Sequence, residues 1–281
     1  MTRKRPGRSP TTAESLREYG RGIGGGFLFS LPLFFTMETW HAAVTVGPGR
    51  LLFAVGATFL LLCGYNLYAG LRHDSTLTEV LIDSVEEMGI GLMLSVCLLY
   101  LLGRLEPAAP LTEHLGLIVL EGMFAAVGVS VGTAQLSSGD DDNSGGPQGP
   151  RHSISSEVVL AMCGSVLIAA NVAPTEEVLV LASEMPVFRL LAVMALSIAI
   201  AALLLFYSDF KGSSRFAGGR SPFGVLHGSA ITYVAALFAS AILLWFFGRF
   251  AHHAASINAA QCVVLGFPAT LGAAAGRLLL R

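Results

Sequence analysis

Eight long apolar runs dominate this sequence of 281 residues. Each matches the length of about 20 residues that a helix needs to cross the hydrocarbon core of a bilayer. Only 13% of the residues are charged, against roughly 25% in a soluble domain. The sequence therefore predicts an all-α polytopic membrane protein with about eight transmembrane helices. The expected spans are 22–47, 50–71, 77–103, 110–136, 155–180, 187–208, 222–248 and 256–280.

Lysine and arginine residues fall mainly on one side of these predicted spans. That side includes the basic start of the chain, and the other side holds only Arg50, Arg104, Arg189 and Arg249. Because cytoplasmic loops are enriched in Lys and Arg, we expect both chain termini in the cytoplasm, which requires an even number of spans.

The two halves of the chain resemble each other. "SVCLLYLLGRL" (95–105) aligns with "SAILLWFFGRF" (240–250), and "GFLFSLPLFFTMET", beginning at Gly26, aligns with "GSVLIAANVAPTEE", beginning at Gly164. With four spans in each half, the two copies would have the same orientation in the membrane. We therefore predict two parallel four-helix repeats. The expected parts are a basic cytoplasmic tail (1–21), a first repeat (22–136), a flexible polar linker (137–153) and a second repeat (154–281).

Carboxylic acids occur inside several of the predicted spans. At the centre of a span each costs roughly 2.5–3.5 kcal/mol on insertion scales, so such residues are typical of ion or proton pathways. The alignment of the halves pairs Glu38 with Glu176, and we expect these two to form a central paired site. The candidate residues for ion binding or a proton relay are Glu38, Asp83, Glu86, Glu87, Glu121, Glu176 and Glu177.

Three of these acids follow the spacing of one helix face. Asp83, Glu86 and Glu87 stand at i, i+3 and i+4, and with Glu121 we expect them to line the cytoplasmic half of the route. Unpaired acids at low dielectric either take up protons or bind a hard cation such as Ca²⁺ or Mn²⁺. In the second repeat their aligned positions carry no acid: Gly228, Ile231, Thr232 and Gly266.

Two prolines stand close to the paired glutamates. Pro32 and Pro174 interrupt the helical hydrogen bonding of their spans, and the freed carbonyl oxygens could line a cavity beside the carboxylates. Thr36, Asn171 and Thr175 lie within about a turn, so we expect them to support the same site. Arg189 is the only basic residue that the sequence places close to Glu176.

The stretches "LPLFFTMETW" and "NVAPTEE" resemble motifs of an uncharacterised bacterial family of integral membrane proteins. The resemblance extends over most of the eight spans and leaves out the tail and the linker. It implies a polytopic fold in the bacterial inner membrane and points to the same glutamates, without implying an activity.

These observations predict a transporter or channel, not an enzyme, that moves cations (protons, divalent cations or both) past intramembrane glutamates. No cofactor is expected apart from a divalent cation, which stays open. The expected partners are the lipid bilayer and ions, with self-association left open and no nucleic acid.

Two alternatives from other classes remain. One is an intramembrane hydrolase similar to the CAAX-protease family, whose second motif is matched by Phe223-xxx-His227. Two motifs depart from that family: Glu176–Glu177 is followed by Leu181 where the family has an arginine, and His253 and Asn258 are one residue too far apart. The other alternative is a non-catalytic membrane sensor or assembly factor.

Overall fold

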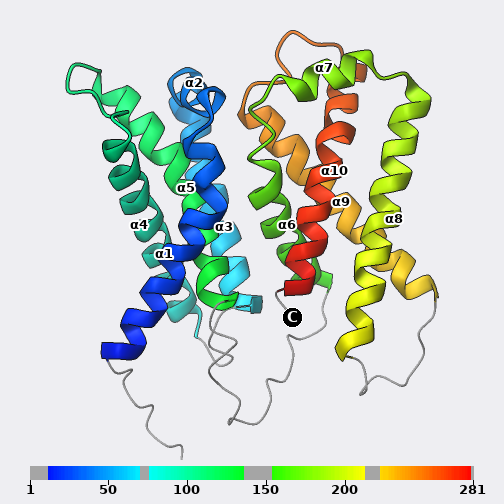
Figure 1. Ribbon diagram of the computed structural model, residues 1–281, viewed down its shortest axis with the longest axis horizontal. Coiled ribbons are helices and arrows are strands. Elements are labelled where there is room, and N and C mark those ends of the chain that lie inside the picture. Colours follow the sequence, from blue (N-terminus) through cyan, green and yellow to red (C-terminus); the bar gives the residue numbers. More distant parts are fainter. Residues whose placement is uncertain (1–11, 70–75, 136–153, 213–221, 280–281) are drawn as a thin grey trace, which may run out of the picture.

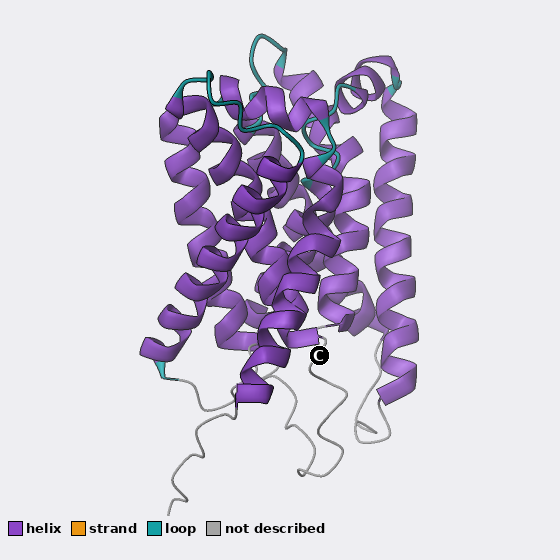
Figure 2. Ribbon diagram, turned by 60° about the vertical axis from the view of Figure 1, so that its left-hand side comes forward, coloured by secondary structure: helices purple, strands orange, loops and turns teal. Residues whose placement is uncertain are grey.

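The computed structural model of the protein describes residues 12–69, 76–135, 154–212 and 222–279. Regular structure in these parts is entirely helical, with ten α-helices and no strand, as predicted for an all-α protein (Figure 2). The predicted linker 137–153 lies outside the described residues, as does the first half of the predicted tail.

Eight of the helices are long and two are short. The long helices are α1 (Thr12–Phe34), α3 (Pro48–Ala69), α4 (Leu77–Leu101), α5 (Leu111–Gln135), α6 (Ile154–Ala169), α8 (Val187–Gly212), α9 (Pro222–Phe246) and α10 (Ala255–Leu279). The short helices are α2 (Met37–Thr45) and α7 (Glu177–Glu184). Both short helices lie at one end of the molecule, and the C-terminus lies at the other (Figure 1). We name these the outer and inner ends, after the predicted orientation.

Within the described residues, six helices are long and apolar enough to cross a membrane: α3, α4, α5, α8, α9 and α10. Helices α1 and α6 run between the same two ends (Figure 1). However, α6 has only 16 residues, and α1 carries Arg17 and Arg21 in its first half. The structure thus confirms an all-helical protein with several membrane-crossing helices, and the count of eight spans stays a prediction.

The first and fifth predicted spans are not continuous helices, which corrects their bounds of 22–47 and 155–180. Helix α1 ends two residues after Pro32, whose ring removes a backbone donor. Thr36 then adopts an extended backbone as the N-cap of α2. Helix α6 ends at Ala169, and a series of turns through Pro174 leads to α7. In both places the chain turns into a short helix at the outer end.

The order long, short, long, long, long occurs once in α1–α5 and again in α6–α10. We call these the first and second halves. The packing partners correspond as well, since α1 packs on α5 and α6 packs on α10. Glycines allow both contacts: Gly25 meets Gly128 and Gly132, and Gly164 meets Gly272 and Gly276. The short helix lies on the last helix of its own half, α2 on α5 and α7 on α10.

The shared "GR" ends of the two aligned segments have a structural cause. Gly103 and Gly248 follow α4 and α9 with φ of 68° and 74°, a left-handed conformation that suits glycine. The next amide N–H, of Arg104 or Arg249, donates to a carbonyl five residues earlier, at 2.9 and 2.8 Å. This is the Schellman helix end. It directs each arginine toward the outer end of its own half.

The two halves meet along α3 and α6. The rings of Phe124 in α5 and Phe247 after α9 stack with centroids 6.3 Å apart. Arg50 of α3 reaches the second half, where its guanidinium donates to the Phe246 carbonyl at 3.4 Å and lies 5.4 Å from the centre of the Trp245 ring. The helices of both halves therefore share a packed interface.

Candidate functional site

Glu121 is the most deeply buried acid of the described residues. It lies in α5, ten residues from the outer start of that helix, and its exposed fraction is 0%. Neither carboxyl oxygen has a hydrogen-bond partner of normal geometry. The Trp40 indole N–H interacts with the carboxyl without reaching normal hydrogen-bond geometry, and the positive charge of Arg104 acts on it at longer range. Since an unpaired polar group in an apolar interior is costly, this position calls for a functional explanation.

Trp40 covers Glu121 from the outer side. The indole belongs to α2, and its N–H is buried without a hydrogen-bond partner. The Arg104 guanidinium, which follows the left-handed turn at Gly103, stacks over the indole ring at 4.0 Å from its centre. A cation at this distance is attracted by the ring quadrupole. Helix α2 and the end of α4 therefore jointly close the outer side of this carboxyl.

A second buried acid, Glu87, lies in a polar cluster at the meeting of α3, α4 and α5. The side-chain amide of Asn66 donates to the Glu87 carboxyl at 2.8 Å and to the Ser84 hydroxyl at 3.1 Å. Ser130 of α5 donates to the Asn66 carbonyl oxygen at 3.4 Å. All four residues are buried. Asn66 therefore organises the cluster, because it has both donors and an acceptor.

The predicted acidic stripe of α4 is only partly interior. Glu87 is buried, Asp83 is half-buried, and Glu86 is exposed. Successive residues of a helix are about 100° apart, so neighbours such as Glu86 and Glu87 point in different directions. Of the three acids, Glu87 alone is buried among the other helices of the first half.

Glu38 and Glu176 do not lie in the middle of a span. They stand at the N-terminal ends of α2 and α7, at the outer end of the molecule. Glu38 is half-buried, and the Glu176 side chain is 80% exposed, 3.9 Å from the Arg249 guanidinium. Because α2 and α7 pack on different helices, the structure does not bring the two glutamates into one site. Glu177 is exposed.

Arg189 was the expected neighbour of Glu176, and the structure corrects this. The Arg189 guanidinium lies 5.8 Å from the centre of the Phe188 ring and makes no ion pair among the described residues. Arg249 takes its place because the helix end after Gly248 turns toward the start of α7. The sequence did not reveal this contact, since the two residues are 73 positions apart.

The polar residues near the prolines serve to end helices. The Thr36 hydroxyl donates to the Pro32 carbonyl at 2.6 Å. Asn171 donates to the Leu167 carbonyl at 2.7 Å, and Thr175 donates to the Val172 carbonyl at 2.8 Å. Their donors therefore stabilise the breaks after α1 and α6, as expected where a proline has removed a helical hydrogen bond. Pro174 is buried within the second of these breaks.

The second half has a buried ion pair where the first half has its polar cluster. Arg277 of α10 is 3% exposed, and its guanidinium lies 2.9 Å from the Glu157 carboxylate of α6. It also donates to the Gly228 carbonyl at 2.6 Å and to the Thr232 hydroxyl at 2.5 Å. Thr232 is the residue that aligns with Glu87. Among the described residues, the second half thus has a fixed charge pair at the depth where the first half has Glu87 with its amide and hydroxyl neighbours.

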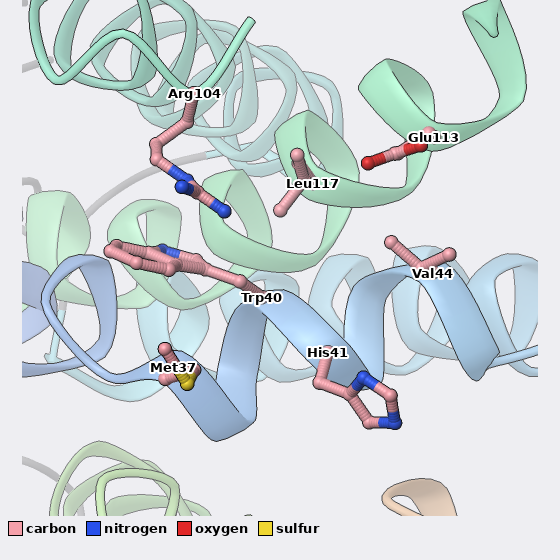
Figure 3. A pocket seen from close by; sticks show the side chains of 7 residues that line it. All are labelled: Met37, Trp40, His41, Val44, Arg104, Glu113 and Leu117. Carbon is pink, nitrogen blue, oxygen red and sulfur yellow. The ribbon is translucent and has the colours of Figure 1, made fainter. Parts of the chain in front are cut away.

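The outer end of the first half contains an open cavity of about 210 Å³. Its wall consists of α2, the start of α5 and the turn after α4 (Figure 3). The lining residues are Met37, Trp40, His41, Val44, Arg104, Glu113 and Leu117. The sequence drew attention to none of them as a site, although an arginine and a tryptophan at a membrane interface were a usable signal.

The structure also bears on the metal and hydrolase hypotheses. In the parts of the chain that are described, no group of three or more His, Cys, Asp or Glu side chains could hold a metal ion. His227 lies near the inner start of α9, whereas Glu176 and Glu177 lie at the outer end. The 19 residues from His227 to the end of α9 correspond to roughly 28 Å of helix. The residues of the hydrolase motifs are therefore too far apart to act on one bond.

Comparison with known proteins gives one result. The family model described as "Putative integral membrane protein (DUF2391)" matches residues 18–280. No curated protein and no solved structure shows significant similarity to the chain.

Proposed function

The chain belongs to the DUF2391 family of integral membrane proteins, and we propose that it moves protons across the bilayer by way of Glu121 and Glu87. The observation that carries this proposal is the Glu121 carboxyl, which is fully buried within the long apolar helix α5 and accepts no hydrogen bond of normal geometry. Ionisable groups at such positions are typical of proton relays in pumps and transporters.

The two acids occupy successive depths of the same half. Glu121 lies on the outer side, beneath Trp40. The Glu87 cluster includes Ser130, nine residues further along α5 toward the inner end. Nine helical residues correspond to roughly 14 Å, so hydroxyl groups or ordered water would have to bridge the gap. Together the two acids supply protonatable groups for the middle of such a route.

Protons fit the arrangement better than divalent cations do. Ca²⁺ needs six to eight oxygen ligands, with several carboxylates or carbonyls converging on one point. Glu121 and Glu87 instead lie singly, one without a partner and one with an amide and hydroxyl groups around it. A single carboxyl group is sufficient to accept and release a proton.

The duplication is part of the same proposal. The corresponding helix order, the glycine contacts and the two Schellman ends support two parallel repeats. In the second repeat Gly266 and Thr232 replace the two acids, and Arg277 with Glu157 holds the inner end. On this basis the first repeat conducts protons, and the second supports it.

The proposal is tested by proton flux into proteoliposomes that contain a pH-sensitive dye. In Glu121→Gln the flux should fall by about tenfold or more, because glutamine keeps the shape but cannot transfer a proton. Glu87→Gln should reduce it similarly. The matched control is Glu184→Gln, at the exposed end of α7, which should leave the flux unchanged.

Two results would contradict proton movement through this route. One is a proton flux in Glu121→Gln and Glu87→Gln equal to that of the unmodified protein. The other is a loss of Ca²⁺ or Mn²⁺ flux in Glu121→Gln, measured with indicators in the same vesicles, while the proton flux stays intact. In that case the site carries the metal ion instead.

A further inference from the structure

Two opposite charges line the outer cavity without pairing. The Arg104 guanidinium stacks on Trp40, and the Glu113 carboxylate points into the same space from α5 (Figure 3). Within the described residues, neither side chain makes an ion pair or a hydrogen bond. Leu117 lies between them. The cavity therefore presents a cationic and an anionic group that are held apart.

We infer that this cavity binds a small zwitterion, with its anionic group on Arg104 and its ammonium group on Glu113. Guanidinium groups bind carboxylates and phosphates through paired hydrogen bonds. A carboxylate in turn accepts hydrogen bonds from an ammonium group. A ligand that carries both charges can pair with Arg104 and Glu113 at once, whereas a ligand with charge of one sign leaves one of the two side chains unpaired.

The lining and the size restrict the ligand further. Apart from the two charges and His41, the wall is largely apolar and is formed by Met37, Trp40, Val44 and Leu117. The volume of about 210 Å³ is below the roughly 300–1,000 Å³ of sites that hold drug-sized ligands. The ligand is therefore a small molecule or a headgroup, with its two charges a few bonds apart across a short apolar segment.

Two sources offer this chemistry: a free amino acid or amine phosphate, and the phosphoethanolamine headgroup of a lipid. The cavity lies at the outer end of the helices, where Trp40 and Trp245 both stand. Tryptophan is enriched at the level of lipid headgroups. Both sources reach such a position, and both present an oxyanion and a primary ammonium group.

The chain offers a direct reporter of this site. It contains two tryptophans, and Trp40 forms part of the cavity wall. In Trp245→Phe, tryptophan fluorescence comes from Trp40 alone. We would titrate this full-length variant in detergent with O-phosphoethanolamine, with ethanolamine and with inorganic phosphate. A saturable change is expected with O-phosphoethanolamine, at a Kd at least about tenfold lower than with ethanolamine or phosphate, each of which carries charge of one sign only. Tenfold corresponds to about 1.4 kcal/mol for the ion pair that such a probe lacks.

The two charges are then removed one at a time in the Trp245→Phe background. Arg104→Gln and Glu113→Gln should each raise the Kd for O-phosphoethanolamine about tenfold, which is the loss of one such pair. The matched controls are Arg189→Gln and Glu106→Gln, two exposed charges at the outer end that lie outside the cavity wall, and they should leave the Kd unchanged. If a neutral variant does not elute as a single species, Arg104→Lys and Glu113→Asp take its place, with a smaller rise expected.

The lipid source is tested in nanodiscs without added ligand. Trp40 emission should differ between discs of phosphatidylethanolamine with phosphatidylglycerol and discs of phosphatidylglycerol alone if the headgroup occupies the cavity. An unchanged emission together with binding of O-phosphoethanolamine or glycine assigns the site to a free zwitterion. The inference is overturned if neither lipid nor zwitterion alters Trp40 emission, or if the response persists in both neutral variants. No proton gradient is present, so the result is independent of proton movement.

Discussion

Arg277→Met is expected to lower the free energy of unfolding by about 3 kcal/mol, the lower end of the range for breaking a buried ion pair. The change leaves Glu157 without its partner at 2.9 Å and removes the donor to Gly228 and Thr232. The cost stays at the lower end because the Glu157 side chain is 26% exposed and stands in the first turn of α6. There, water and the helix N-terminus stabilise its charge.

Glu157→Leu should cost more, about 5 kcal/mol, because it leaves a charged arginine that is only 3% exposed. The double variant should regain much of the loss, since replacing both partners by apolar residues leaves no uncompensated charge. Unfolding by SDS titration in mixed micelles measures all three. Arg189→Met, at an exposed arginine without an ion pair among the described residues, should change stability by less than about 0.5 kcal/mol. Additive single effects would show that the pair is not coupled.

The second large effect is expected for a substitution of Gly25, whereas the same substitution of its neighbour Gly24 should have little effect. A methyl group added at Gly25 would lie 2.5 Å from the Gly128 carbonyl oxygen, 2.9 Å from the Gly132 nitrogen and closer still to the Gly132 Cα. These are backbone atoms, which cannot move aside as a side chain can. Gly25→Ala should therefore force α1 away from α5, at a cost of about 3 kcal/mol.

Gly24 is the matched control because a methyl group there meets nothing within 4 Å. Gly24→Ala should stabilise the helix slightly, by up to about 1 kcal/mol. Gly164→Ala should behave as Gly25→Ala does, since its methyl group would meet the carbonyl of Gly272 and, at 3.0 Å, the Cα of Gly276. Thermal unfolding of the purified variants compares the three. Equal melting temperatures for Gly24→Ala and Gly25→Ala would mean that α1 and α5 are not held in close contact.

Much of the helical plan was readable from the chain. The apolar runs predicted the long helices, because a bilayer requires about 20 apolar residues in each crossing. Pro32 and Pro174 marked where two runs would break, since proline removes a backbone donor. At each proline, however, the long helix ends and a short helix follows. Glu38 and Glu176 therefore lie in or beside these short helices, at the outer end of the molecule. Hydropathy alone cannot distinguish one kinked transmembrane helix from a long helix followed by a short one, because both have the same apolar residues.

Glu121 and Glu87 were two of the seven candidate acids predicted from the sequence, because an acid in an apolar run is costly wherever the run packs. Their surroundings depended on the tertiary structure. Asn66 and Ser130 come from two other helices, and only the crossing of α3, α4 and α5 joins them to Glu87. Helical periodicity determines which residues share one face of a single helix. It does not determine how helices rotate against each other, which close packing at small residues decides.

The same division explains the outer cavity. The two aligned segments of the sequence share the dipeptide "GR", and the structure shows that its glycine, Gly103 in the first half, follows the end of α4 in a left-handed conformation that suits glycine. Where the next residue, Arg104, would point was decided by α2, which places Trp40 4.0 Å beneath the guanidinium. Local backbone conformation, such as a left-handed turn at glycine, depends on residues that are adjacent in the sequence. Contacts between side chains 64 positions apart are set by how whole helices pack, and that is why the carboxyl of Glu121 was predicted from sequence while its cover was not.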